Sequence, residues 1–186
     1  MQEWLFLVYK IPSEPSRYRA TVWRKIKALG AVYLQNSVCV LPAVRDNERY
    51  FRQLRKEITE FGGEAYLIKG TMLGTEQGVI DLFNGARDEE YGEIIHRCEE
   101  FLEEIEAETG NQHFTYAELE ENEEDLAKLE KWLEKVSERD FFQAGLAGKT
   151  KEILEECRAR LNSFAEKVFA WEDSLRAGEA GRRENS

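Results

Sequence analysis

Four basic residues in the first seventy recur at the spacing of a single helix face. They follow one another at steps of four, three and four residues: Arg45, Arg49, Arg52 and Lys56. With 3.6 residues per turn, these steps place the four side chains within a narrow arc. The opposite side of the same helix carries a hydrophobic stripe: Phe51, Leu54, Ile58 and Phe61. We therefore expect a solvent-facing row of positive charge, called here the basic ridge.

A second basic cluster lies earlier in the chain. It comprises Lys10 at the end of a predicted strand and the helical residues Arg17, Arg19 and Arg24, with Lys25 and Lys27 beside them. Side chains of this kind bind phosphate backbones, because each neutralised phosphate releases condensed counterions. The planar guanidinium of arginine also suits a small oxyanion such as chromate or sulfate. Two plainer interpretations remain open: a solvated surface, or docking onto the acidic helices of the same chain.

Catalytic motifs are missing from the sequence. It contains no GxxxxGK[ST], GxGxxG, GxSxG or HExxH pattern. Only two histidines occur, and the three cysteines are about sixty residues apart, unlike the paired ligands of a structural zinc site. Cys98 and Cys157 fall on hydrophobic helix stripes and are interpreted as core residues. We expect no catalytic residue, no cofactor and no metal site, and hence no enzyme.

The elements that position the basic residues follow from apolar runs and breakers. The pattern predicts strands at 4–11, 31–35, 38–41 and 64–69, and helices at 17–29 and 46–61. Ser16 is the expected N-cap of the first helix, and Gly30 its C-terminal stop. The order β-α-β-β-α-β predicts a ferredoxin-like domain over residues 1–70, with the first strand central. The fold class is α+β.

Beyond residue 70 the composition changes. Residues 1–70 carry 12 Lys and Arg against 7 Asp and Glu, whereas residues 71–186 carry 14 against 30. We expect a connector over 71–86, an acidic antiparallel helical bundle over 87–175, and a flexible tail over 176–186. The predicted bundle helices are 87–108, 118–139 and 149–175, and Trp171 and Leu175 close the inward stripe of the last one. The acidic residues keep the bundle soluble or shield the basic ridge.

The sequence also bears on location. The chain starts without the basic segment of a signal peptide, and no apolar run approaches the roughly 20 residues that span a bilayer. We expect a cytoplasmic protein that does not enter a membrane, with its cysteines reduced.

The segment 4–42 resembles the opening of the N-terminal domain of the chromate-resistance regulator family, ChrB. The shared pattern is an apolar strand ending before a proline, an Arg-rich helix containing Trp23-Arg24, a Leu29–Ala31 stop, and two strands that end at Leu41-Pro42. Segments 62–67 and 139–142 match as well, so that the resemblance spans residues 3–175. A fainter likeness connects the chain to the phenylacetate-catabolism repressors, PaaX.

The resemblance implies a transcriptional regulator that responds to chromate and controls a chromate efflux pump. Arg17, Arg19, Trp23 and Arg24 match the Arg-rich helix of the family, which would be the place for contact with DNA or an oxyanion. We interpret Trp23 as a packing residue. Longer family members continue into a second domain associated with chromate resistance, so the resemblance does not imply that this segment alone senses chromate.

A contrast with another family argues against nuclease activity. Small CRISPR-associated nucleases of similar element order place a metal-binding aspartate at the end of the first strand. Lys10 occupies that position here, and an ammonium group cannot ligate Mg²⁺, which requires oxygen ligands. The leading hypothesis is therefore a non-enzymatic DNA-binding regulator, expected as a homodimer that pairs through the sheet edge or the Phe164/Trp171 helix. The alternatives are a protein-interaction module and an oxyanion sensor.

Overall fold

The computed structural model describes residues 2–184, with side chains described through residue 178. Within that span the chain forms one four-stranded antiparallel sheet and five helices. It divides into two compact units. Unit 1 is Met1–Arg87 with Glu138–Ala144, and unit 2 is Asp88–Ser137 with Gly145–Ser186. In the described part of the chain, no helix is long and apolar enough to cross a membrane.

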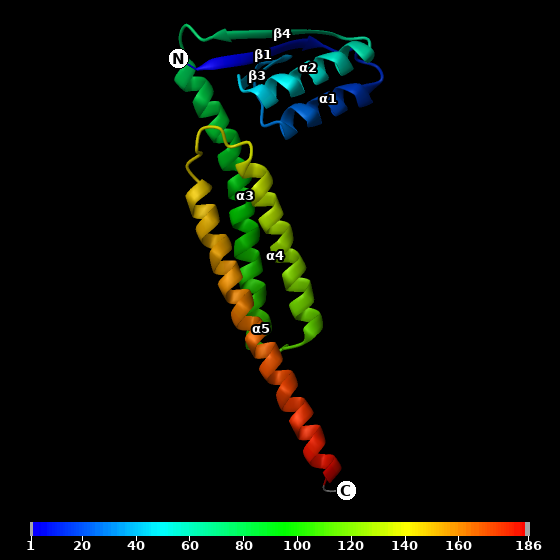
Figure 1. The fold of residues 1–186 in the computed structure, drawn as a ribbon, viewed down its shortest axis with the longest axis vertical. Helices are drawn as coiled ribbons and strands as arrows, with labels where there is room; N and C mark the ends of the chain where they lie inside the picture. Colours follow the sequence, from blue (N-terminus) through cyan, green and yellow to red (C-terminus); the bar gives the residue numbers. More distant parts are fainter. Residues whose placement is uncertain (1, 185–186) are drawn as a thin grey trace. The chain divides into compact units, whose positions relative to one another are not determined.

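Unit 1 contains the sheet, two complete helices and the start of a third, coloured blue to green in Figure 1. In chain order the elements are β1 (Glu3–Lys10), α1 (Ser16–Ala28), β2 (Val32–Gln35), β3 (Val38–Pro42), α2 (Arg45–Glu60) and β4 (Glu64–Thr71). The strands lie in the order β2-β3-β1-β4, so the expected central position of the first strand is confirmed. One detail was wrong: Pro15, not Ser16, is the N-cap of α1, and no side chain caps that end.

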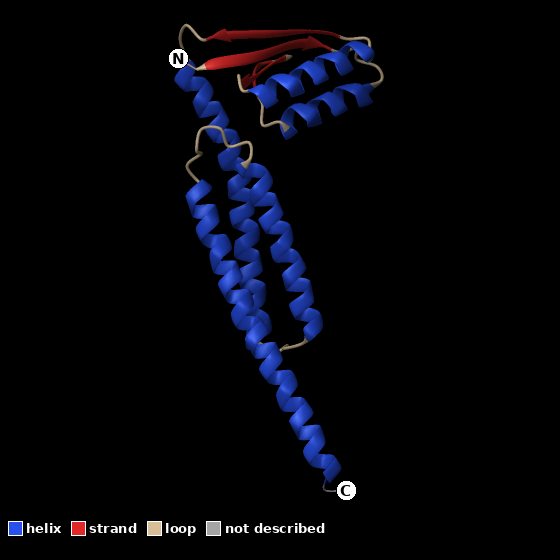
Figure 2. Ribbon diagram, in the orientation of Figure 1, coloured by secondary structure: helices blue, strands red, loops and turns tan. Residues whose placement is uncertain are grey.

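The two faces of the sheet are covered by different segments. Because side chains alternate along a strand, Leu5 and Leu7 share one face, and Trp4, Phe6 and Val8 share the other. Helices α1 and α2 lie along one face (Figures 1 and 2) and supply to the core the buried residues Val22, Ile26, Phe51, Leu54 and Ile58. Leu5 and Leu7 are fully buried, whereas Phe6 and Val8 are only half-buried. The helices therefore cover the face of Leu5 and Leu7.

The opposite face is covered in part by residues that the sequence assigned to a connector and a loop. Helix α3 (Glu76–Gly110) begins eleven residues before the expected start at residue 87. Its first turns bring Phe83 to 5.8 Å from Trp4, measured between ring centroids, and Phe142 lies 5.7 Å from the same ring. Trp4 is fully buried by these contacts. The glycines at 78 and 85 did not end the helix, because the aromatic cluster around Trp4 stabilises it.

Gly30 has the role that the sequence predicted for it. Its φ of +74° lies in the left-handed region that glycine adopts without strain. The N–H of Gly30 donates to Lys27 O, and the N–H of Ala31 to Ile26 O, which closes the C-terminal turn of α1. A Cβ at Gly30 would lie 2.7 Å from Arg139 Cβ. The position therefore requires glycine for both conformation and space.

Unit 2 contains the rest of α3, α4 (Tyr116–Ser137) and α5 (Ala147–Glu184). Its core includes the expected stripe residues: Ile94, Cys98, Phe101, Ile105, Leu126, Leu129, Val136, Leu154, Cys157, Leu161, Phe164 and Val168. Trp171 and Leu175, expected inward, are exposed. The last part of α5 runs beyond the turn that joins α3 to α4 (Figure 1), so no neighbouring helix covers it. The backbone stays helical through Glu184, where a tail was expected from residue 176; residues 185 and 186 lie outside the described part.

A carboxyl pair closes the end of unit 2 at the turn between α3 and α4. Asn122 is buried and donates from Nδ2 to Glu108 Oε2 at 2.9 Å and to Glu118 O at 2.8 Å. The pKa of Glu108 is raised to about 7, chiefly by burial and next by hydrogen bonding to Glu118, while the hydrogen bond from Asn122 acts in the opposite direction. The protonated carboxyl can therefore bridge the two glutamates, whereas two carboxylates repel each other.

We expect unit 2 to lose stability as the pH rises toward neutrality. The folded-state pKa of Glu108, about 7, lies above its ordinary value of 4.5. The stabilisation is therefore complete below about pH 4.5 and is lost as the pH rises through about 7. Because the carboxyl is only partly buried and solvent screens it, we expect a loss of about 1 kcal/mol or less. Urea unfolding at pH 5.5 and 8 measures it. Glu108→Gln should remove the dependence, and the exposed Glu103→Gln should keep it; an unchanged pH profile in Glu108→Gln would contradict the assignment.

Candidate nucleic-acid and oxyanion interface

The basic ridge lies on the exposed side of α2, as its spacing predicted. All four side chains are exposed, while the buried residues of the helix lie on the other side: Asn47, Phe51, Leu54 and Ile58. Two ridge residues pair with acidic neighbours one turn earlier. Arg49 Nη2 is 3.4 Å from Asp46 Oδ1, and Arg52 Nη2 is 2.6 Å from Glu48 Oε1. These exposed pairs are weak, so both guanidinium groups remain able to exchange a carboxylate for a phosphate.

Helix α1 adds positive charge beside the ridge. Arg17 and Arg24 are seven residues apart and share one side of the helix, whereas Arg19 lies on a different flank. All three are exposed. The Arg17 guanidinium lies over the Tyr18 ring at 5.2 Å from its centroid, and Tyr18 stacks on Phe61 at 4.2 Å. This stack connects the start of α1 to the C-terminal end of α2 and fixes the helices side by side.

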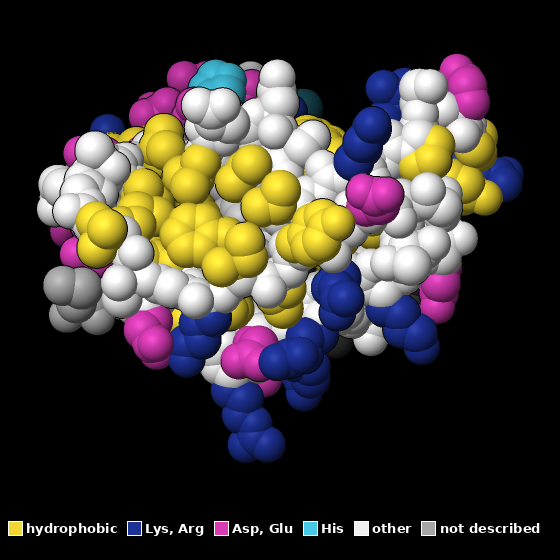
Figure 3. Space-filling model, turned by 90° about the horizontal axis from the view of Figure 1, so that it is seen from above, with side chains coloured by type: hydrophobic (Ala, Val, Ile, Leu, Met, Phe, Trp, Pro, Cys, Tyr) yellow, Lys and Arg dark blue, Asp and Glu magenta, His cyan; other side chains and the backbone are white. Residues whose placement is uncertain are grey.

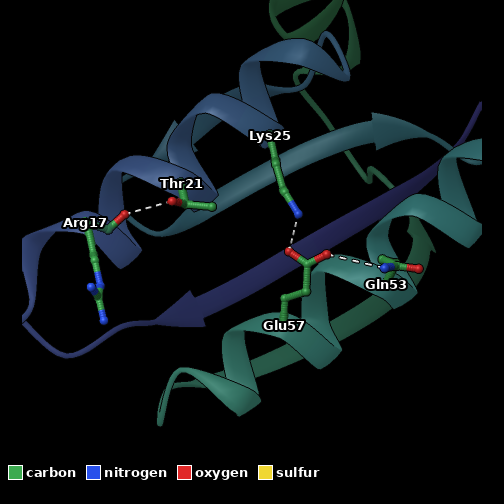
Figure 4. Close-up of polar contacts among 5 residues, drawn as sticks. All are labelled: Arg17, Thr21, Lys25, Gln53 and Glu57. Atoms are coloured by element: carbon green, nitrogen blue, oxygen red, sulfur yellow. Dashed lines mark hydrogen bonds and ion pairs between the residues drawn. The ribbon is translucent and has the colours of Figure 1, made fainter.

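A polar contact joins the two helices further along. Figure 4 shows Lys25 of α1 reaching across to Glu57 of α2, which also accepts a hydrogen bond from Gln53. In Figure 4 the carbonyl oxygen of Arg17 accepts a hydrogen bond from the Thr21 hydroxyl. The Arg17 guanidinium makes no contact with the other residues drawn there. The ion pair of Lys25 with Glu57 therefore joins α1 to α2. Arg17 and Arg24 remain exposed on the same side of α1.

Lys10 lies apart from the helical arginines. It is the last residue of β1 and shares a sheet face with Phe6 and Val8, because side chains alternate along the strand. Helices α1 and α2 cover the other face. Lys10 is exposed, and its partner in the strand register is Glu64 of β4. The structure therefore leaves Arg17, Arg24 and the four ridge residues exposed on neighbouring helices, with Arg19 on another flank of α1 and Lys10 on the other face of the sheet.

A shallow hollow of about 370 Å³ lies at the C-terminal half of the ridge. Arg52, Arg55 and Lys56 line it, together with Thr59 and Glu60. Sequence analysis missed Arg55, because at 3.6 residues per turn it lies outside the arc of the ridge. Its Nε donates to the backbone oxygen of Ala65 at 3.1 Å, which holds the guanidinium between α2 and β4. Three cationic side chains around one hollow provide the geometry to bind a tetrahedral oxyanion.

Two exposed aromatic residues accompany the charges. Trp23 on α1 is 53% exposed, so its interpretation as a packing residue was wrong. It lies beside the core-facing side of α1, about 60° around the helix from the buried Ile26. Tyr50 on α2 is 45% exposed, with the Arg49 guanidinium 5.1 Å from its ring centroid. Arginines next to exposed aromatic rings are a combination that proteins use to contact nucleic acid.

All three cysteines are buried, and burial raises the pKa of the Cys39 thiol to about 12, far from the range of a reactive thiolate. Among the described residues, no group of three or more His, Cys, Asp or Glu side chains is arranged to hold a metal ion.

Comparison with known proteins identifies the family. Residues 19–175 match the family described as Protein ChrB, N-terminal. The match covers most of the chain, so the chain belongs to this family, as the resemblance in segment 4–42 indicated. Membership relates it to regulators of chromate resistance. No curated protein matches the chain.

Proposed function

We propose that the chain is a non-enzymatic, DNA-binding regulator of the chromate response that acts in the cytoplasm. Unit 1 in this proposal is a ferredoxin-like domain, which the strand order β2-β3-β1-β4 and the two helices on one face support. Unit 2 is an antiparallel bundle of α3, α4 and α5. The basic surface of α1 and α2 contacts the phosphate backbone.

The observation that supports this proposal is the alignment of charge along α2. Arg45, Arg49, Arg52 and Lys56 cover its exposed side over a span of twelve residues, which is eleven steps along the helix. At a rise of about 1.5 Å per residue, the ridge is on the order of 16 Å long, enough to follow several phosphates of one strand. The two ion pairs in the ridge involve exposed partners and are readily exchanged.

DNA binding is tested by fluorescence anisotropy with a labelled fragment from upstream of the gene. We expect affinity to fall by roughly a hundredfold or more between about 50 and 200 mM salt, because several phosphate contacts release counterions together. The upstream fragment should bind more tightly than random DNA of equal length. Absence of binding at the lower salt concentration would contradict the proposal.

A second candidate function is suggested by the hollow at Arg52, Arg55 and Lys56. Its size and charge suit a small oxyanion. If it binds chromate, chromate should raise the melting temperature more than sulfate does at equal ionic strength, and Arg55→Ala should abolish the difference. Equal shifts with both anions would indicate a general salt effect.

A further inference from the structure

The sheet of unit 1 has two edge strands, β2 and β4, which differ in how readily they could pair with a further strand. Strand β2 has four residues, and its pairing with β3 shifts register between Tyr33 and Gln35. Strand β4 has eight residues and pairs with β1 without a shift, from Glu64 through Thr71. Short, irregular edges resist the addition of another strand, whereas long, regular edges accept one. The accessible edge is therefore β4.

Backbone groups of alternate β4 residues point toward that edge. Tyr9 and Ala65 are partners in the β1–β4 register, yet the N–H of Tyr9 donates to Ser37 O on the opposite side of β1. Antiparallel partners alternate between bonded and non-bonded pairs, so Ala65, Leu67 and Lys69 direct their N–H and C=O groups away from β1. The bond from Arg55 Nε to Ala65 O agrees with this direction.

Apolar side chains lie along the β4 edge on one face of the sheet. Tyr66 is 62% and Ile68 50% exposed, and Phe6 and Val8 are half-buried on the same face of β1, next to Val38 of β3. We call these five residues the open patch. Seen from the side where Figure 1 draws β4, hydrophobic side chains gather into a broad area (Figure 3).

The charges of β4 do not protect this edge. Lysine on an edge strand often prevents pairing, but Lys69 Nζ lies 2.9 Å from Glu3 Oε2 of the neighbouring β1. Its charge is thereby compensated inside its own sheet. Glu64, the remaining charged residue of the strand, lies at its end.

We propose that β4 pairs with β4 of a second copy of the chain, antiparallel about a two-fold axis at Leu67. In this register Leu67 bonds to its counterpart, and Ala65 bonds to Lys69 of the second copy. Ala65 O already accepts from Arg55 Nε, and its second lone pair receives the bond from the N–H of Lys69. Tyr66 then faces Ile68 of the second copy in a non-bonded pair, where Cα atoms approach to about 4.5 Å and side chains pack most closely.

The strand is also electrostatically compatible with itself. In the same register Glu64 faces Gly70 of the second copy, and Lys69 faces Ala65, so no like charges stand opposite each other. The pairing extends the sheet and covers part of the open patch of each copy. It does not depend on DNA binding; if both hold, each dimer carries two basic ridges related by the two-fold axis.

Sedimentation velocity of the full chain over a wide concentration range tests the pairing. We expect a monomer–dimer equilibrium that Tyr66→Lys with Ile68→Lys weakens by about tenfold or more, since it places like charges opposite each other. Leu73→Lys serves as a control for an added lysine near the strand. Leu73 is fully exposed in the turn after β4, so this change should leave the equilibrium unchanged. Arg49→Ala with Arg52→Ala should also leave it unchanged, which separates dimerisation from DNA binding.

Cysteine cross-linking tests the register. Tyr66→Cys with Ile68→Cys should form a covalent dimer under a mild thiol oxidant, because the Cα separation of a non-bonded pair suits a disulfide. The three native cysteines are buried and give a low background. Tyr66→Cys alone should cross-link weakly. A chain that stays monomeric at all concentrations, or a dimer that the two lysines do not weaken, would overturn the proposal.

Discussion

Replacing Trp4 with alanine is expected to lower the stability of unit 1 by about 3–5 kcal/mol. Trp4 is fully buried, contacts the rings of Phe83 and Phe142, and donates from Nε1 to Glu76 Oε1 at 3.3 Å. The change removes a large apolar surface and leaves a cavity between the sheet and the start of α3. Small domains have total stabilities of about 5–15 kcal/mol, so much of the stability of unit 1 should be lost. Hydrogen exchange of β1 and β4 amides measures the loss directly.

The matched control uses another tryptophan of the same unit. Trp23 is half-exposed on α1, so Trp23→Ala should change stability by no more than about 0.5 kcal/mol. Amides of α4 provide an internal reference, because they belong to unit 2. If Trp4→Ala cost less than about 1 kcal/mol, the aromatic cluster would not hold the start of α3 against the sheet.

The helices and strands of unit 1 could be predicted from the sequence, because hydrophobic periodicity and the positions of proline and glycine agree with one another there. Proline and glycine stand at the ends of most elements, and Gly30 illustrates why such a signal works: its left-handed φ is required by the turn itself. The helical period of α2 likewise assigned its buried side and the basic ridge. Such features depend on residues within one or two turns of each other.

The start of α3 could not be predicted from the sequence, because it depends on contacts between residues that are far apart along the chain. Gly74, Gly78 and Gly85 indicate a connector when only their neighbours are considered. Phe83 becomes helical and buried because Trp4 and Phe142 surround it, and these lie 79 residues before and 59 residues after it. Hydrophobic periodicity describes one helix or strand at a time, so it cannot show that these three rings contact one another.

The composition of the candidate site shows the same limit. Periodicity placed each arginine on its own helix but could not show that Lys25 is engaged with Glu57, that Arg55 joins the hollow, or that Lys10 belongs to the other sheet face. The exposure of Trp23 also escaped prediction, since a tryptophan near a helix stripe usually packs inward. Relations between elements, more than the elements themselves, define this surface.

Arg49→Ala combined with Arg52→Ala is expected to weaken DNA binding by about tenfold or more at low salt. If each arginine contacts one phosphate, the slope of log affinity against log salt should become shallower by about 2. Folding should be nearly unaffected, because both residues are exposed and their ion pairs are surface pairs within one helix. Anisotropy titrations at several salt concentrations measure both quantities.

Unit 2 offers a control with the same change of charge and the same kind of ion pair. Arg97 pairs with Glu100 at a spacing of three residues, and Arg160 with Glu156 at four, as Arg49 and Arg52 do on α2. Arg97→Ala with Arg160→Ala therefore changes net charge equally without touching the basic ridge. If both double variants lost affinity to the same extent, DNA would be responding to overall charge. If only the ridge variant lost affinity, with the expected change in slope, the exposed side of α2 would be the contact surface.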